Sequence, residues 1–174
     1  MTIAEAPRPA ARPEPDDPGR TTIRRRTARA LVLDRRDRAL LLHRDAKIRD
    51  VGDRYLHTPG GGLEPGETPA AAAARELGEE LGLSVAPGDL GAPVATCYSL
   101  QQRIDTGAFV AADDTFFMLR ADPAAIALPS PTHRWLDPDA MDAAPDRILP
   151  RGLPDLLRRL LAEGAPETPI HIRW

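Results

Sequence analysis

Short apolar runs separated by polar turns dominate the chain from residue 27 onward. Residues 30–33 are apolar, residues 34–37 are charged, and residues 39–42 are apolar again. Two apolar runs on either side of a short polar turn are typical of a β-hairpin. Further strands are predicted at residues 54–58, 92–100, 108–120 and 134–136, and residues 169–174 predict an edge strand. This pattern predicts a sheet built from short strands.

Residues 68–81 predict a helix whose two ends are both marked in the sequence. Thr68 is a favourable N-cap residue, and Pro69 suits the first helical position, where its missing N–H costs nothing. The alanine run that follows favours helix strongly. Gly82 can end the helix, because glycine adopts the left-handed conformation that helix C-termini often need.

Both ends of the chain differ in character from its middle. Residues 137–139 predict the start of a short helix, and residues 154–162 predict a closing amphipathic helix with its leucines on one side. Residues 1–20 contain five prolines among charged side chains and little to bury, which predicts a disordered arm. Residues 21–174 are therefore expected to form one domain, and 174 residues in total suit one domain better than two.

Charge and cysteine content narrow the expected partners. The formal net charge is −3, so the chain has no overall positive field to attract a large nucleic acid or an anionic membrane. Cys97 is the only cysteine, which excludes an intramolecular disulfide and a zinc site made of several cysteines. No apolar stretch reaches the length of a membrane span. We expect a cytoplasmic protein, a monomer or homodimer, with a small-molecule partner.

The helix at residues 68–81 separates an acidic side from an apolar side. On a helical wheel the carboxylates of Glu76, Glu79 and Glu80 fall within a sector of about 100°. A separate stripe is apolar and is formed by Ala70, Ala74, Leu77 and Leu81. The acids lie in the C-terminal half, where the helix dipole disfavours negative charge, so a compensating cation is expected.

Two kinds of cation can meet that need. Arg75 and Arg44 can offset part of the charge, although a solvated glutamate-rich surface is the common reading of such a helix. Three carboxylates beside the consecutive glycines 60–62 also suit a hard cation such as Mg²⁺. The ligand of such a cation would be a phosphate, because Mg²⁺ usually completes its octahedron with water and substrate phosphates.

The order of these residues carries more information than their type. Gly61, Glu67, the triplet 75–77, the pair 79–80 and the pair 82–83 occupy fixed spacings over residues 61–83. Apart from the two leucines among these nine positions, the seven fixed identities at fixed spacing have a chance probability on the order of 10⁻⁸ per starting point. The segment resembles the Nudix box in every specified position, and the hairpin before it and the strands after it also resemble that family.

The resemblance implies a fold and an activity. It implies an α/β (α+β) chain folded as an α/β/α sandwich around a mixed β-sheet, with a Nudix hydrolase domain at residues 21–174. The implied enzyme is a pyrophosphohydrolase that uses Mg²⁺, with Mn²⁺ as a substitute. Water would attack one phosphorus of a P–O–P linkage in a nucleotide substrate.

The resemblance also implies residue roles. Glu79 and Glu80 would be the principal metal ligands, Glu76 a further ligand or the general base, and the Gly60 carbonyl an extra ligand. Arg75 would orient a glutamate, and Glu67 would brace the loop. The cations expected to bind substrate phosphates are Arg29, Arg44, Arg54 and Arg103.

Other residues stay open as contributors. The general base of the family is sometimes an acid from a distant loop, which keeps Asp105, Asp113 and Asp114 as alternatives to Glu76. His57 lies beside the glycines and is expected to be packed or solvent-facing, with substrate contact as the alternative. Tyr55, Tyr98 and Trp135 are expected mainly in packing roles.

Two other functions compete with hydrolysis. An isoprenoid-diphosphate isomerase on the same fold would be expected to use a cysteine ahead of the box, whereas Cys97 follows it. A nucleotide-sensing module without turnover is the other alternative, and the intact acids argue against it. The box itself does not specify the leaving group, because the segments associated with particular substrates lie outside it.

Overall fold

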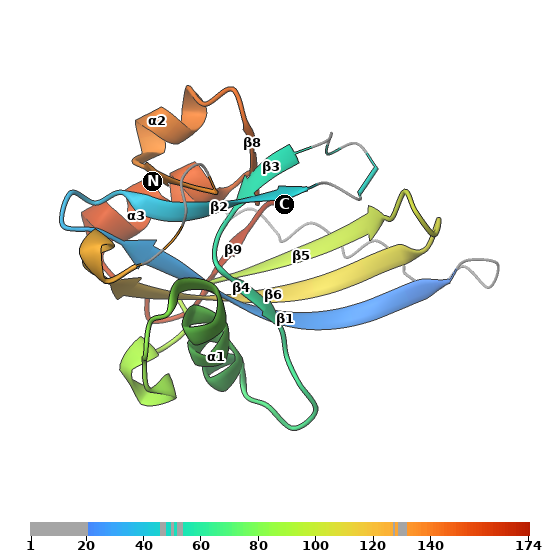
Figure 1. The fold of residues 1–174 in the computed structure, drawn as a ribbon, viewed down its shortest axis with the longest axis horizontal. Helices are drawn as coiled ribbons and strands as arrows, with labels where there is room; N and C mark the ends of the chain where they lie inside the picture. The colour runs from blue at the N-terminus through green and yellow to red at the C-terminus, as the bar shows by residue number, and fades with distance from the viewer. Residues whose placement is uncertain (1–20, 46–47, 50, 52–53, 127, 129–131) are drawn as a thin grey trace, which may run out of the picture.

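The fold is a curled mixed β-sheet with helices on both of its faces (Figure 1). The computed structural model describes residues 21–174 apart from 46–47, 50, 52–53, 127 and 129–131. The arm predicted at residues 1–20 lies outside the described residues. The α+β class predicted from sequence is confirmed, and no helix in the described part of the chain is long and apolar enough to cross a bilayer.

The bounds of the elements are as follows. The strands are β1 (Thr22–Leu33), β2 (Ala39–Asp45), β3 (Arg54–His57), β4 (Gly60–Gly62), β5 (Ala95–Gln102), β6 (Phe109–Arg120), β7 (His133–Leu136), β8 (Arg147–Leu149) and β9 (Ile170–Ile172). The helices are α1 (Pro69–Leu81), α2 (Pro138–Asp142) and α3 (Leu153–Glu163), with short 3₁₀ helices at Pro87–Leu90 and Pro123–Ala125.

The centre of the sheet is a long parallel pair, β1 and β6. The strand order is β8-β3-β2-β1-β6-β5-β9, and the β1–β6 register runs from Thr22 opposite Phe109 to Leu33 opposite Arg120. β5 pairs antiparallel with β6, and β9 adds a parallel strand at the edge. The short glycine strand β4 lies antiparallel to the middle of β1 and places the glycine segment against the sheet.

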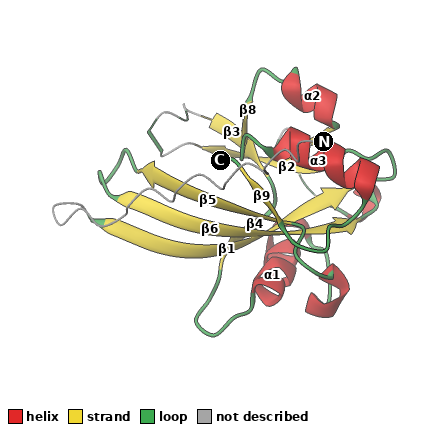
Figure 2. Cartoon of the chain, turned by 180° about the vertical axis from the view of Figure 1, so that it is seen from behind, coloured by secondary structure: helices red, strands yellow, loops and turns green. Residues whose placement is uncertain are grey.

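Two separate cores lie on the two faces of the sheet, because alternate residues of a strand point to opposite faces. Leu31 and Leu33 of β1 join the core that packs against α3, whereas Ala30 and Val32 join the core that packs against α1. In the two opposite views α1 lies on one side of β1 and β6, and α2 and α3 lie on the other (Figures 1 and 2).

Helix α1 begins and ends where the sequence predicts. Thr68 Oγ1 accepts a hydrogen bond from the Ala71 N–H at 3.2 Å, and Pro69 occupies the first turn. Gly82 has a positive φ of 69°, and its N–H donates to the Gly78 carbonyl at 3.0 Å. The helix is thus closed at both ends by the residues that mark it.

The buried face of α1 differs from the predicted stripe. Leu77 and Leu81 are buried as expected, but the buried alanines are Ala72 and Ala73. The predicted pair, Ala70 and Ala74, is half-buried and packs at the margin of the same core. At 100° per residue Ala72 and Ala73 both lie on the glutamate side of the leucines, so the buried face of the helix extends toward the carboxylates that approach β4.

The other predicted elements are present with small shifts in their bounds. The hairpin, the strands at 54–58, 92–100, 108–120 and 134–136, the short and closing helices, and the edge strand are confirmed. β4 and β8 were not predicted, since three glycines and a three-residue segment carry no alternating pattern.

Candidate active site

The glycine strand β4 brings the main chain unusually close to β1 and α1. Gly60 has φ of +131°, and a Cβ placed there would lie 2.2 Å from the Ala28 carbonyl oxygen. A Cβ on Gly61 would lie 2.2 Å from Glu76 Oε1. Only glycine avoids both contacts, because any other side chain would displace β1 or the Glu76 carboxylate.

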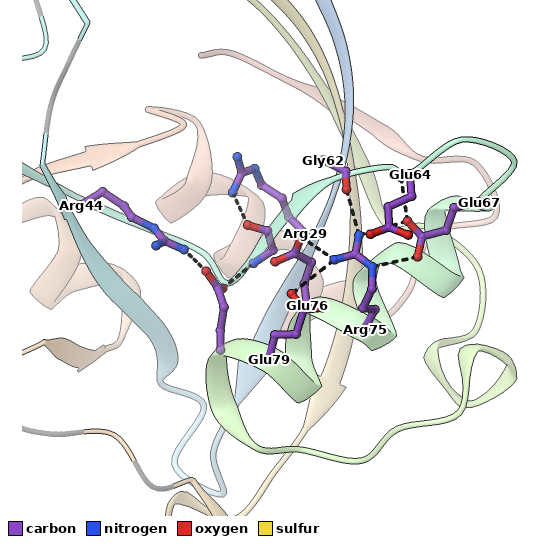
Figure 3. A network of polar contacts seen from close by, with 10 residues as sticks. Arg29, Arg44, Gly62, Glu64, Glu67, Arg75, Glu76 and Glu79 are labelled. Atoms are coloured by element: carbon purple, nitrogen blue, oxygen red, sulfur yellow. Dashed lines mark hydrogen bonds and ion pairs between the residues drawn. The ribbon is translucent and has the colours of Figure 1, made fainter.

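Arg75 organises the carboxylates around this strand (Figure 3). Its Nε and Nη2 donate to the two oxygens of Glu67, each at 3.0 Å, and Nη2 also donates to the Gly62 carbonyl at 2.9 Å. Its Nη1 donates to Glu76 Oε1 at 2.9 Å and to Glu79 Oε2 at 3.4 Å. One guanidinium therefore connects the loop before α1 to two glutamates on the helix.

These contacts shift the pKa values of both Arg75 and Glu67. The hydrogen bonds that Arg75 donates to Glu67 and Glu76 raise the pKa of Arg75 above its ordinary value. The same bond from Arg75, with a backbone N–H bond at Glu64, lowers the pKa of Glu67. Both groups are charged at neutral pH, so the bridge is a charge-assisted, two-point contact of the kind that fixes geometry.

Glu80 is held by a separate pair of donors. The Gly60 N–H donates to Glu80 Oε2 at 2.9 Å, and Arg44 forms an ion pair with the other oxygen. Burial lowers the pKa of Arg44, and the positive charge of Arg29 lowers it further. Glu80 thus lies between the glycine strand and β2, apart from the Arg75 bridge.

The helix carboxylates fit a hard cation by chemistry, although they are paired with arginines here. The side chains of Glu76 and Glu80 are 14% and 18% exposed, whereas that of Glu79 is 59% exposed. In the described part of the chain no three acidic, imidazole or thiol groups converge as around a bound ion. The donor set is nevertheless all oxygen, as Mg²⁺ prefers, and it faces a strand without side chains.

Arg29 links the glycine strand to a buried acid. Its Nε donates to Asp114 Oδ1 at 3.1 Å, and its Nη1 lies 3.4 Å from the Gly60 carbonyl oxygen. Thr27 Oγ1 also donates to Asp114 Oδ1. The same Nη1 lies 2.8 Å from His57 Nδ1, and burial together with this cation holds the pKa of His57 well below its ordinary value.

This network forms the floor of a cavity of about 270 Å³ on the sheet face opposite α1. We call it the Arg29 pocket. It is lined by Arg25, Thr27, Arg29, Asp45, Ile48, Tyr55, His57, Ser99, Gln101, Arg103, Val110, Ala112, Asp114 and Trp174. The rings of Tyr55 and His57 are 5.8 Å apart, and those of His57 and Trp174 are 6.3 Å apart, so one wall is aromatic.

The four arginines expected to bind substrate occupy different places. Arg29 and Arg103 line the Arg29 pocket, and Arg44 lies on Glu80 beside it. Arg103 also forms an ion pair with Asp105 at 2.5 Å. Arg54 does not line that pocket, because the strand alternation that turns Tyr55 and His57 toward the cavity turns Arg54 the other way.

The acids considered as alternatives to Glu76, and the tyrosine Tyr98, also lie at different places relative to the Arg29 pocket. Asp114 lies in the pocket and is 2% exposed, whereas Asp113 is exposed on the other face of β6. Asp105 is exposed, and Arg103 lowers the pKa of its carboxyl group. Tyr98 alternates with the pocket residue Ser99 and so points away from the cavity.

Several residues of the site were not found from sequence. Arg25 and Thr27 reach the cavity from β1, Ser99 and Gln101 reach it from β5, and Trp174 reaches it from the C-terminal segment. The spacing of two residues between neighbouring members on β1, and on β5, indicates that the members on each strand share a face of the sheet. Which face that is depends on the strand register. Trp174 gives no such signal, because it lies outside any strand.

Comparison with known proteins agrees with the motif and the fold. The family model described as "NUDIX domain" matches residues 23–157. The chain therefore belongs to the Nudix family. It is accordingly an enzyme of the Nudix hydrolase class, which acts on pyrophosphate bonds.

Solved structures share the fold at low sequence identity. A MutT protein from Bacillus halodurans matches with a TM-score of 0.54 and 21% identity, over 86% of this chain and 90% of that one. A MutT protein from Methanosarcina mazei matches with a TM-score of 0.52 and 19% identity, over 84% of this chain and 98% of that one. A MutT Nudix hydrolase from Burkholderia pseudomallei matches with a TM-score of 0.51 and 20% identity, over 79% of this chain and 98% of that one. These similarities confirm the fold.

Proposed function

We propose that the chain hydrolyses a P–O–P linkage, with Mg²⁺, in a nucleoside triphosphate or a nucleoside diphosphate linked to another moiety. The observation that carries the proposal is the continuous polar network from the α1 glutamates through the Gly60 strand to Arg29 and its pocket. A diphosphate at the glutamates can extend its nucleoside into that pocket. The cytoplasmic location and the monomeric or homodimeric state remain predictions.

The carboxylates of Glu76, Glu79 and Glu80 are the groups that would hold the cation, together with the Gly60 carbonyl. Mg²⁺, or Mn²⁺ in its place, supplies Lewis acidity that polarises a phosphoryl group and makes water a better nucleophile. Arg75 and Arg44 neutralise the same carboxylates in the structure. The guanidiniums are then available to stabilise substrate phosphates when the carboxylates take a different partner.

Glu76 is the general base of this proposal. Its carboxylate accepts a hydrogen bond from Arg75 and occupies the space that a Cβ on Gly61 would need. Arg75 acts as a positioning residue, and Glu67 holds Arg75 from the loop. Asp114 is less suited to the role, because Arg29 and Thr27 engage it on the floor of the pocket.

Substrate contacts follow from the charges around the pocket. Arg29 lies between the Gly60 carbonyl and Asp114, and Arg44 lies beside Glu80, so both are near the place of the diphosphate. Arg103 also lines the cavity. Arg54 is the least supported of the four arginines, because its side chain points away from the Arg29 pocket. The aromatic wall of Tyr55, His57 and Trp174 suits a flat base.

Hydrolysis of a substrate panel tests the proposal. Nucleoside triphosphates, nucleotide sugars, ADP-ribose and dinucleoside polyphosphates are incubated with the protein and Mg²⁺, and the products are separated by ion-exchange chromatography. We expect turnover of at least one compound, and its loss in Glu79→Gln. Glu167→Gln, an exposed glutamate outside the site, is the matched control. Tight binding without turnover across the panel would favour the sensing module instead.

A further inference from the structure

A second cavity, of about 320 Å³, adjoins the Arg29 pocket. It is lined by Ile48, Arg49, Val51, Leu100, Gln101, Gln102, Phe109, Arg147, Leu149, Arg151 and Trp174. We call it the basic pocket. Ile48, Gln101 and Trp174 line both cavities, so the two are neighbours with a common wall.

The basic pocket has a charge unlike that of the chain. Arg49, Arg147 and Arg151 come from three different segments, and no acidic side chain is among the described residues that line it. By contrast, the Arg29 pocket contains Asp45 and Asp114 beside its arginines. Since the whole chain carries a formal charge of −3, a described lining with three arginines and no carboxylate indicates a local preference for an anion.

Main-chain contacts place these arginines around the cavity. The Arg49 N–H donates to the Gln102 carbonyl at 2.8 Å, and Ile48 forms a β-bridge with Arg103, which ties the Arg49 segment to the end of β5. Arg147 lies in β8, in register with Tyr55 of β3. The Gly152 N–H donates to the Arg173 carbonyl at 2.9 Å, which holds the segment of Arg151 beside Trp174.

The two cavities have a definite order relative to the glutamates. Arg29, on the floor of the first pocket, reaches the Gly60 carbonyl. No described residue of β4 or α1 lines the basic pocket. The order is therefore the glutamates, the Arg29 pocket and then the basic pocket. A nucleotide with its diphosphate at the glutamates and its nucleoside in the Arg29 pocket would direct any further group toward the basic pocket.

We propose that the basic pocket binds a second phosphate of the substrate, a phosphomonoester on the nucleoside that occupies the Arg29 pocket. The inference rests on the proposed function and makes it narrower. The substrate is then a nucleoside diphosphate derivative with a further phosphate on its ribose. Arginine is suited to this task because its guanidinium binds phosphate oxygens at two points.

Binding is measured first, because it does not depend on turnover. Isothermal titration compares adenosine 3′,5′-bisphosphate and adenosine 2′,5′-bisphosphate with AMP, and guanosine 3′,5′-bisphosphate with GMP. We expect at least one bisphosphate to bind about tenfold more tightly than its monophosphate, the value for charge-assisted contacts to one phosphate. Equal affinities in every pair would overturn the inference.

The arginines are tested by a charge-matched pair of double variants. Arg49→Gln/Arg151→Gln is expected to reduce the preference for the bisphosphate to about twofold or less, with the affinity for the monophosphate unchanged. Arg36→Gln/Arg159→Gln removes the same charge from exposed positions outside both pockets and should keep the wild-type preference. A preference that survives in the first variant, or falls equally in both, contradicts a specific site.

Hydrolysis separates this inference from the proposed function. Coenzyme A is compared with dephospho-coenzyme A, and NADPH with NADH, since each pair differs by one ribose phosphate. The inference predicts a higher kcat/KM for a phosphorylated member, and loss of that difference in Arg49→Gln/Arg151→Gln. Equal kcat/KM values with good turnover would overturn the inference alone. Bisphosphate preference in titration without hydrolysis of any compound would support the pocket and contradict the proposed function.

Discussion

Replacing Arg29 by methionine leaves the Asp114 carboxylate without its cation. The Asp114 side chain is 1% exposed and that of Arg29 is 15% exposed, so water cannot replace the lost partner well. Removing one member of a buried ion pair typically costs about 3–5 kcal/mol. For a chain of this size each 1 kcal/mol lowers Tm by about 2–4 °C, which gives a decrease of about 6–20 °C.

Two further variants identify the cause of that loss. The double variant Arg29→Met/Asp114→Asn removes the buried charge as well, and we expect it to recover at least about 2 kcal/mol of the loss. Arg159→Met breaks an exposed ion pair whose side chains are 53% and 63% exposed, and should change stability by no more than about 0.5 kcal/mol.

Urea unfolding at pH 7, followed by circular dichroism, measures all of these free energies. A free-energy loss in Arg29→Met no larger than that in Arg159→Met would contradict the role of the buried ion pair. The single variant Asp114→Asn is measured alongside them. If the double variant is as unstable as the sum of Arg29→Met and Asp114→Asn, the loss comes from packing and not from an unpaired charge.

Three other changes test the local geometry. Thr68→Ala removes the N-cap of α1 and should cost about 1 kcal/mol in urea unfolding, with most of it recovered by serine. Gly61→Ala places a Cβ against Glu76 and should lower kcat by about 100-fold or more, whereas Gly88→Ala, with open space at its Cβ, should keep wild-type activity. Because the pKa of His57 is depressed in the folded state, the unfolded chain binds its proton more readily and stability falls as pH drops below about 6.5. In His57→Gln the free energy of unfolding should change less between pH 7 and pH 5 than in the wild type. An unchanged slope would show that His57 is not the group whose protonation destabilises the fold.

Local signals predicted the helix that carries the carboxylates. Thr68, Pro69 and Gly82 mark the ends of α1 through contacts within a few residues, so the sequence contains all that is needed. The carboxylate sector was predicted for the same reason, because helical geometry fixes which side chains share a face. The burial of Ala72 and Ala73 depends on how the helix packs on β1 and β4, which no local pattern reports.

The parts that sequence could not predict depend on pairing between distant segments. Arg29 and Asp114 are 85 positions apart and meet because β1 and β6 pair in parallel register. Arg54 and Arg103 looked equivalent in sequence, yet only Arg103 lines the Arg29 pocket. A shift of one residue in register would reverse the face of every side chain in a strand, so the choice needs the structure.

The most direct test of the central claim is hydrolysis in ¹⁸O-labelled water with Mg²⁺. The substrate is whichever compound of the panel is turned over, and mass spectrometry locates the label in the products of the wild type and of Glu79→Gln. Attack of water on phosphorus predicts one ¹⁸O atom in one of the two phosphorylated products of the wild type, and no turnover by the variant. Unlabelled phosphates, or turnover by Glu79→Gln at the wild-type rate, would contradict the account.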